Sequence, residues 1–457
     1  MAQYTYDLLV IGAGAAGNTA ATTAAQNGTR VALVERDKIG GTCLNYGCDP
    51  TKTLIYIASL LHHAQHAEKY GLRIDDARSD WASVMSWVHQ CINRIRGGTA
   101  EDAARDLSSK GIDVLMDEAT FISPHELSIG DKSISAEHII IASGGKNVVP
   151  PIEGLHDVGF ISNVEAVSLS SLPRRLAVVG GGAIGMEFAQ MFHRFGVEVT
   201  VLEHSPQLLD KEDREMADTL CKLLTQEDLR METEVELVRI QRNSQGKCLT
   251  IRCGKREEEQ LVVDEILLAI GRQPALAALH LEKAGVKTGK KGIEVDATLR
   301  TNVPHIWAAG DVTGGYQFTH VAYEQGKLAA HNAFAQKPQP FDGSVIPWVT
   351  FTDPALSHVG KTEEQLREEK TAYRVERMYF KDVERAVAEG ETEGLVKLLV
   401  DQQGKLLGGH VLAPKAGDLL APIILAMHAG ISVETLASTI IPYPTMAEGV
   451  RWAADKL

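Results

Sequence analysis

One structural unit occurs twice in this chain, and the repeat narrows the folds that are open to it. The first copy starts with residues 6–11, an apolar run typical of a buried strand, which leads directly into the glycine run 12–17. An alanine-rich segment typical of a helix follows, and a second apolar run, 30–34, ends at Glu35. A strand, a tight glycine turn, a helix and a strand that ends in an acid predict a dinucleotide-binding βαβ unit.

The second copy lies far along the chain. Residues 175–179 form the apolar run, residues 180–185 the glycine run, and residues 198–202 the next apolar run, which ends at Glu203. The glycines let a backbone approach a pyrophosphate, and the helix start directs N–H groups and a positive dipole at it. Two such units predict two dinucleotides, one held and one exchanged, as hydride transfer between a nicotinamide and a flavin requires.

Glu203 also bears on which nicotinamide is used. A carboxylate at this place accepts a hydrogen bond from a free 2′-hydroxyl and repels a 2′-phosphate. The residues that follow, His204 and Ser205, offer no guanidinium for a phosphate. The sequence therefore favours NADH over NADPH.

The segments outside the two repeated units indicate where the domains begin and end. Short apolar strands end in glycine near residues 144 and 271, and the run 301–311 places Asp311 just after a buried strand, where it can hold a flavin cofactor. From Gly343 the pattern changes to mixed β-type and helical segments. We predict an α/β fold with two Rossmann-like domains and a C-terminal α+β domain. The expected divisions are an FAD-binding domain 1–150, an NAD(H)-binding domain 151–271, a central part 272–342 that completes the FAD domain, and a C-terminal domain 343–457.

Composition excludes several classes of partner. The net charge is −14 and no basic cluster stands out, so nucleic acid and anionic membranes are poor candidates. The single N-terminal apolar run, 8–11, is too short for a signal sequence or a membrane span. These features predict a cytoplasmic protein.

Two of the six cysteines lie in an unusual segment. Cys43 and Cys48 are separated by four residues where a glycine turn meets a helix. A helix start stabilises a thiolate and lowers its pKa from about 8.5 toward neutrality, so the two thiols are predicted to be a redox pair. His62 and His66 have the i,i+4 spacing of a metal site, but no third ligand is evident, and we predict no metal site.

Residues 41–52, the two glycine runs and the pair Gly310–Asp311 resemble the class I pyridine nucleotide-disulfide oxidoreductases in order and over essentially the whole length. This family includes lipoamide dehydrogenase, glutathione reductase and mercuric reductase. The resemblance implies FAD on the first unit and a pyridine nucleotide on the second. It also implies that the C-terminal domain forms a homodimer in which each active site is completed by the second subunit.

The resemblance assigns roles in an electron path. It implies that Cys48 touches the flavin as a thiolate, that Cys43 attacks the substrate, and that Lys52 and Glu187 pair beside the flavin N5. Electrons would pass from NADH through FAD to the Cys43–Cys48 disulfide, and then to an acceptor disulfide or a thiol-bound metal ion such as Hg(II).

Two sets of cofactor residues follow from the motifs and the resemblance. The FAD site is expected to comprise Gly12, Gly14, Gly17, Glu35, Thr42, Lys52, Ala119, Ser143, Gly144, Asp311, Thr319 and His320. The NAD site is expected to comprise Gly180, Gly182, Ile184, Gly185, Glu203 and Gly271.

The sequence departs from this family at the group that handles protons. The disulfide reductases supply a histidine from the second subunit, in a His-x-His-Pro run paired with a glutamate, whereas this chain has Tyr443 there, followed by Glu448. A phenol, with a pKa of about 10, suits proton transfer at neutral pH less well. Residues 442–449 look instead like mercuric reductases. However, residues 453–457 contain no cysteine pair of the kind those enzymes carry, and we expect no N-terminal metal-carrier domain.

Three activities remain open from the sequence. The first is an NADH-dependent flavoprotein reductase of a disulfide or a thiol-bound metal ion. The second is a diaphorase-like reductase of quinones, in which the cysteines only hold electrons. The third is a redox-sensing flavoprotein without turnover, which the intact hydride path between two nucleotides disfavours.

Overall fold

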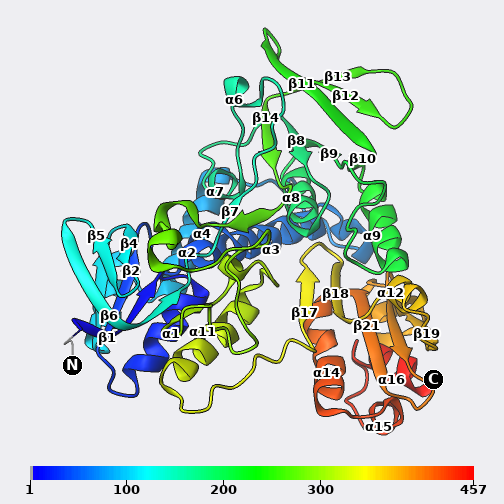
Figure 1. The fold of residues 1–457 in the computed structure, drawn as a ribbon. Helices are drawn as coiled ribbons and strands as arrows, with labels where there is room; N and C mark the ends of the chain where they lie inside the picture. Colours follow the sequence, from blue (N-terminus) through cyan, green and yellow to red (C-terminus); the bar gives the residue numbers. More distant parts are fainter. Residues whose placement is uncertain (1–3) are drawn as a thin grey trace.

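The N-terminal part of the molecule is built on a seven-stranded, largely parallel sheet (Figure 1). The computed structural model describes residues 4–457. The strand order is β3-β2-β1-β6-β5-β4, and β16 pairs in parallel with β6. Central strands are buried on both faces, which is why they read as continuous apolar runs. The strands are β1 (Tyr6–Ile11), β2 (Val31–Glu35), β3 (Ile112–Met116), β4 (Ala119–Ser123), β5 (Glu126–Ile129), β6 (Lys132–Ile141) and β16 (Ile306–Ala308).

Two helices that are far apart in the sequence pack against each other beside this sheet. They are α1 (Ala15–Ala25) and α11 (Thr319–Phe334), which lie side by side at the lower left of Figure 1. A Cβ built on Gly326 of α11 would lie 2.1 Å from the Ala16 carbonyl oxygen of α1. The helices therefore approach at backbone contact, which only a glycine permits.

Helices also fill the space between the two nucleotide units. The long helix α3 packs against α8 of the second unit, and the short strands β7 (Gly145–Asn147) and β15 (Arg272–Pro274) pair between the units. No helix within residues 4–457 is both long and apolar enough to span a membrane. The helices of this part are α2 (Gly41–Tyr46), α3 (Cys48–Gln65), α4 (Trp81–Arg96), α5 (Ala100–Ser109), α6 (Leu155–Val158), α7 (Asn163–Ala166) and α10 (Leu281–Ala284), with the 3₁₀ turns Ala67–Tyr70, Ala277–Leu279 and Asp311–Thr313.

The second unit has a smaller parallel sheet with the order β10-β9-β8-β14, next to a separate antiparallel sheet β11-β12-β13 (top of Figure 1). Helices α8 (Ala183–Arg194) and α9 (Arg214–Gln226) belong to this unit. Its strands are β8 (Arg175–Val179), β9 (Glu198–Leu202), β10 (Arg230–Glu232), β11 (Val235–Asn243), β12 (Gly246–Cys253), β13 (Glu259–Val263) and β14 (Glu265–Leu268).

The C-terminal part is a five-stranded antiparallel sheet with helices, at the lower right of Figure 1. The strand order is β17-β18-β21-β20-β19. This arrangement agrees with the predicted α+β domain. Its elements are β17 (Pro347–Thr350), β18 (Ala355–Gly360), α12 (Glu363–Glu368), β19 (Arg374–Tyr379), α13 (Glu384–Glu389), β20 (Leu395–Val400), β21 (Leu406–Ala413), α14 (Ala416–Ala429), α15 (Val433–Ser438) and α16 (Glu448–Asp455), with the 3₁₀ turn Phe380–Asp382.

The structure refines the sequence prediction around the two cysteines. A glycine turn leading into one helix was expected, but Cys43 lies on its own short helix, α2, and Cys48 begins α3. Gly47 separates the helices because its φ of −132° and ψ of −110° are not helical. The turn at Gly47 reverses the chain, so that the thiols of Cys43 and Cys48 lie next to each other.

Candidate functional site

The first glycine turn leaves no room for a side chain at its third glycine. Gly12 follows β1 with a φ of +98°. A Cβ built on Gly17 would lie only 1.7 Å from the Gly12 carbonyl oxygen. Gly14 immediately precedes α1, so the free N–H groups of the first helical turn lie at this loop. Strand and helix therefore meet closely enough to present backbone donors to a phosphate.

Glu35, the last residue of β2, braces this turn. Its carboxylate accepts the Ala13 N–H at 2.7 Å and the Asp37 N–H at 2.8 Å. A carboxylate has about four acceptor positions, so Glu35 keeps capacity for a ribose hydroxyl.

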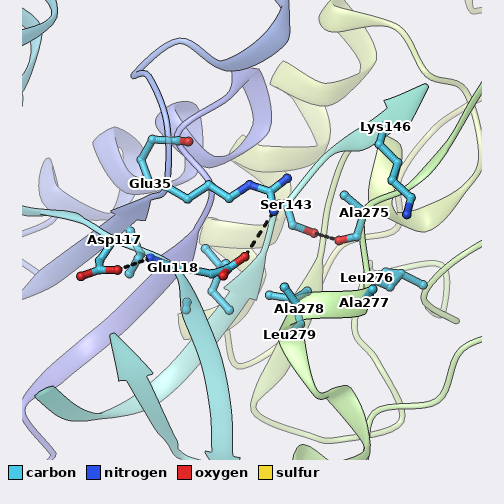
Figure 2. A pocket seen from close by; sticks show the side chains of 15 residues that line it. Glu35, Asp117, Glu118, Ser143, Lys146, Ala275, Leu276, Ala277, Ala278 and Leu279 are labelled. Carbon is cyan, nitrogen blue, oxygen red and sulfur yellow. Dashed lines mark hydrogen bonds and ion pairs between the residues drawn. The ribbon is translucent and has the colours of Figure 1, made fainter. Parts of the chain in front are cut away.

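A cavity of about 170 Å³ opens beside Glu35 (Figure 2). Ala119 and Ser143 line it together with residues 275–279, and the Ser143 hydroxyl donates to the Ala275 carbonyl at 3.0 Å. Gly144 follows Ser143 with a φ of +70°. A carboxylate beside a partly apolar cavity fits the adenosine end of a dinucleotide, so the residues present are compatible with FAD.

The second glycine turn repeats the geometry of the first. Gly180 has a φ of +110°, and a Cβ on Gly185 would lie 1.9 Å from the Gly180 carbonyl oxygen. Glu203 accepts the N–H groups of Gly181 at 2.6 Å and Ser205 at 2.7 Å.

The surroundings of the second turn are open. Gly182, which precedes α8, has no neighbouring atom within 4 Å of a built Cβ, and Ile184 is 41% exposed. Gly271 lies beyond the end of β14 with a φ of +116°. All six residues expected to bind the nicotinamide cofactor thus lie on this turn or at the strand ends beside it.

The two redox cysteines share their charge unequally. A hydrogen bond from Cys43 lowers the pKa of Cys48 to about 6, against the opposing effect of burial, and Thr319 and Lys52 add to the lowering. The Cys48 Sγ lies 3.5 Å from the Thr319 hydroxyl at the start of α11. The hydrogen bond to Cys48 and burial raise the pKa of Cys43. Negative charge therefore resides on Cys48, while Cys43 keeps its proton.

An ion pair joins the cysteine helix to the second nucleotide unit. Lys52 Nζ on α3 lies 2.6 Å from Glu187 Oε2 on α8, and Glu187 is only 4% exposed. The other Glu187 oxygen accepts the Phe351 N–H at 2.8 Å, and the Phe351 ring lies 4.6 Å from Lys52 Nζ. Glu187 and Phe351 thus hold the Lys52 ammonium group about one helical turn from Cys48.

Asp311 and Thr42 both contact the guanidinium group of Arg272. Arg272 Nε lies 3.5 Å from the Asp311 carboxylate, and another guanidinium nitrogen is 3.5 Å from the Thr42 hydroxyl. Arg272 also donates to the Gly145 carbonyl at 2.7 Å. Burial raises the pKa of Asp311, and Arg272 opposes that effect.

His320 points toward the C-terminal domain. Its Nε2 lies 2.9 Å from the Pro347 carbonyl oxygen, and its ring stacks on Phe318 at 5.5 Å between centroids. Thr319, by contrast, contacts Cys48. The two residues thus link α11 to different neighbours.

Tyr443 and Glu448 lie in the C-terminal domain rather than beside the cysteines. Tyr443 is 70% exposed on the loop before α16, while Glu448 is buried and accepts the Thr445 N–H at 3.1 Å. Within residues 4–457, no hydrogen bond or ion pair links either residue to Cys43 or Cys48. The same described part of the chain holds no group of three or more His, Cys, Asp or Glu side chains placed to bind a metal ion.

Sequence reasoning missed Phe351, Arg272 and Asp49. The first two carry no local signal, because each acts only through contacts with residues far away in the sequence. The position of Asp49 next to Cys48 is plain from the sequence, but only the structure shows that no side chain of the described residues pairs with its carboxylate. Tyr323, one turn into α11, lines a cavity with Cys43 and Asp49.

Two dinucleotide turns beside a cysteine pair, with a lysine–glutamate pair between them, define a flavin- and pyridine nucleotide-dependent dithiol oxidoreductase. The chain belongs to the pyridine nucleotide-disulphide oxidoreductase family: the family model matches residues 6–326, and the model of its dimerisation domain matches residues 346–454. The predicted family and fold class are confirmed.

Several relatives match nearly the whole chain. A mercuric reductase from Staphylococcus aureus is 36% identical over 98% of this chain and 82% of its own length. A dihydrolipoyl dehydrogenase from Thermus scotoductus is 38% identical over 99% and 97%. A solved Cu(II) complex of the HOCl-induced flavoprotein disulfide reductase RclA from Escherichia coli is 32% identical, has a TM-score of 0.89 and covers 100% of both chains. The protein is thus an enzyme of a family that uses FAD and NAD(P)H.

Proposed function

We propose that this enzyme takes electrons from NADH and delivers them through Cys43 and Cys48 to a small-molecule disulfide or a thiol-bound metal ion such as Hg(II). The observation that carries the proposal is the position of the Cys48 thiol, which contacts Cys43 and Thr319 within one helical turn of Lys52. FAD, when bound, supplies the carrier that accepts a hydride from the nicotinamide and passes an electron pair to the disulfide.

The chain's own residues prepare the thiols for this exchange. Thr319 and Lys52 favour negative charge on Cys48, and Glu187 with Phe351 holds the lysine in place. A thiolate on Cys48 is the form that displaces a leaving group from Cys43 after substrate attack. The arrangement thus supports a division of labour in which Cys43 meets the acceptor and Cys48 resolves the intermediate.

We further infer that NADH is the preferred donor. Glu203 directly follows β9, and its carboxylate is held against the glycine turn by the Gly181 and Ser205 N–H groups. A carboxylate fixed in this position accepts from a 2′-hydroxyl and repels a 2′-phosphate. No arginine follows it in the sequence before Arg214.

The names of the relatives and the identity of Tyr443 support a metal ion as one acceptor. Mercuric reductase and a structure with Cu(II) are among the similar proteins. Tyr443 stands where the disulfide reductases have an acid–base histidine, and a phenol with a pKa of about 10 serves that role less well at neutral pH. The dihydrolipoyl dehydrogenases among the relatives support a disulfide acceptor equally well.

We propose that the functional unit is a homodimer in which Tyr443 and Glu448 of one copy complete the site of the other. The C-terminal domain is the family's dimerisation domain. Its exposed loop carries Tyr443, at 70% exposure, and Ile440, at 96%. Sedimentation of the FAD-loaded enzyme should give a dimer, and a fully active monomer would contradict this assignment.

Anaerobic NADH titration tests the electron path. The reduced wild type should show a long-wavelength charge-transfer absorbance. Cys48→Ser should abolish this band, and Cys43→Ser should make it constitutive, because a thiolate then remains on Cys48. The proposal fails if both variants keep a reducible disulfide signal.

The acceptor is identified in a second step. NADH oxidation is followed with alkyl and aromatic disulfides, Hg(II), Cu(II) and quinones, for the wild type and both cysteine variants. Loss of turnover in both variants places the acceptor at the thiols. Quinone turnover that survives in both would show a diaphorase instead.

A further inference from the structure

A second cavity, of about 320 Å³, opens on Cys43. It shares no lining residue with the cavity beside Glu35 and lies between the starts of α1 and α3 and the helices α4, α5 and α11. Asp49 and Tyr323 line it together with Cys43. Cys43 lines this cavity and Cys48 does not, so the cavity is a space through which an acceptor can reach Cys43.

Of the two carboxyl groups that line this cavity, Asp106 is paired with Lys110 and Asp49, within residues 4–457, is not paired. Within the described residues, no hydrogen bond or ion pair engages its carboxylate. Two nearby cations are paired with other carboxylates: Lys52 with Glu187 at 2.6 Å and Lys110 with Asp106 at 2.6 Å. Arg96 donates to the amide oxygens of Asn45 at 2.6 Å and Asn93 at 3.1 Å, and within the described residues it makes no ion pair with Asp49.

The chemistry of the pair creates a need for a base at this place. Because Cys48 carries the negative charge, Cys43 keeps its proton and cannot attack until it loses it. Burial raises the pKa of Asp49, while Lys52 opposes the shift, so the carboxyl is moved toward the range in which it exchanges protons. Tyr323, whose pKa is also raised by burial, remains protonated beside it.

We propose that Asp49 is the acid–base group that moves the proton between Cys43 and the leaving thiol of a disulfide acceptor. The inference rests on the proposed function and replaces the histidine that this chain lacks at position 443. Asp49 lines the same cavity as the attacking thiol of its own chain. Tyr443 reaches a Cys43 only across the proposed dimer, and its phenol, with a pKa of about 10, transfers protons poorly at neutral pH.

The acceptor disulfide is reduced by thiol–disulfide exchange. The Asp49 carboxylate takes the proton of Cys43, and the resulting thiolate attacks one sulfur of R–S–S–R, so that the bond between Cys43 and SR forms and the S–S bond breaks. The leaving thiolate takes the proton back from Asp49. The Cys48 thiolate then displaces the second RS⁻, which is protonated by water, and the Cys43–Cys48 disulfide forms. The dithiol loses two electrons and the acceptor gains them as two RSH.

Asp49→Asn tests this proposal through the acidity of the leaving thiol. Holoenzyme is reduced with dithiothreitol, desalted and mixed in single turnover with either 2-hydroxyethyl disulfide or 5,5′-dithiobis(2-nitrobenzoate). The alkyl thiol leaves poorly without a proton, whereas the aromatic thiolate leaves unaided. Loss of the acid should slow the alkyl disulfide about 100-fold and the aromatic disulfide less than about tenfold. Asp49→Glu should recover most of the alkyl rate.

Asp106→Asn is the matched control, because it removes a carboxylate from the same cavity that is already paired with Lys110. It should change both rates by the same factor. Equal effects of Asp49→Asn on the two disulfides, or no effect, would overturn the proposal. Because the enzyme is reduced chemically, the result does not depend on NADH; a wild type that exchanges disulfides but accepts no electrons from NADH would refute the proposed function alone.

Discussion

The glycine turns of the two dinucleotide units have the same local geometry, but the residues that surround the two turns differ. In each, a glycine after the strand adopts a positive φ, the third glycine of the motif touches the first, and a glutamate at the end of the next strand accepts two loop N–H groups. The glutamates Glu35 and Glu203 even bind corresponding backbone positions, Ala13 and Gly181. The local geometry therefore does not distinguish a held cofactor from an exchanging one.

The two cofactor sites differ in the residues that pack against the helix after each glycine turn. At the first unit, Gly326 of α11 presses on the Ala16 carbonyl, a Cβ on Gly310 would lie 3.3 Å from the Ala16 side chain, and Ala16 is 5% exposed. At the second unit, Ile184 occupies the corresponding place just inside the helix and is 41% exposed. A covered site suits a cofactor that stays bound, and an open site suits one that leaves after each turnover. The difference is supplied by segments outside the repeat.

The largest expected effects come from placing a valine side chain in each glycine turn, because the two variants should lose different cofactors. Gly17→Val should prevent FAD retention, because a side chain there meets the Gly12 carbonyl. Gly185→Val creates the same clash in the second turn and should leave FAD bound while abolishing flavin reduction by NADH. Flavin absorbance after gel filtration and stopped-flow reduction measure the two outcomes. Loss of FAD in both variants would mean that the units are not independent.

A smaller effect is expected from charge at the strand ends. Glu203→Gln keeps an acceptor for the loop but removes the carboxylate, so kcat/KM for NADH should fall about tenfold, since a charge-assisted hydrogen bond contributes about 1.5–3 kcal/mol. The value for NADPH should rise as the repulsion disappears. Glu35→Gln is the companion variant and should weaken FAD retention without changing this ratio. A wild type with the higher kcat/KM for NADPH contradicts the assignment.

A pH titration of the reduced enzyme measures the pKa of the Cys48 thiol, to which both dinucleotide units are proposed to deliver electrons. The Cys48 pKa is lowered to about 6, so its thiolate, and the charge-transfer absorbance of the reduced enzyme, should be present above that pH and fade below it. Thr319→Val removes one hydrogen bond to the sulfur and should raise the midpoint by about one unit. An unchanged midpoint would show that α11 does not stabilise the thiolate.

The smallest effect concerns the open side of the second turn. Ile184→Ala removes a half-exposed side chain, so the free energy of unfolding should change by less than about 0.5 kcal/mol. If Ile184 packs on the nicotinamide cofactor, KM for NADH should rise about tenfold with FAD content unchanged. Thermal unfolding and steady-state kinetics of the same preparation measure both quantities. An unaltered KM would remove Ile184 from the cofactor site.

Much of this enzyme could be predicted from the sequence because it depends on neighbours in the chain. The glycines at 12, 17, 180 and 185 and the glutamates at 35 and 203 act within single βαβ units, whose geometry is local. The α/β fold, the C-terminal α+β domain and the family were predicted in the same way and are confirmed. The roles assigned to individual residues, Tyr443 included, stay predictions.

The tertiary structure alone decided which distant residues meet. Thr319 contacts Cys48, Phe351 contacts Lys52, and Gly326 packs on Ala16 of α1, although nothing in the intervening sequence fixes these contacts. It also showed that within residues 4–457 the Asp49 carboxylate has no hydrogen-bond or ion-pair partner, because Lys52 pairs with Glu187 and Lys110 with Asp106. Such facts follow from the packing of helices and sheets against one another, because a contact between segments remote in sequence is set by the arrangement of whole elements and not by the residues beside it.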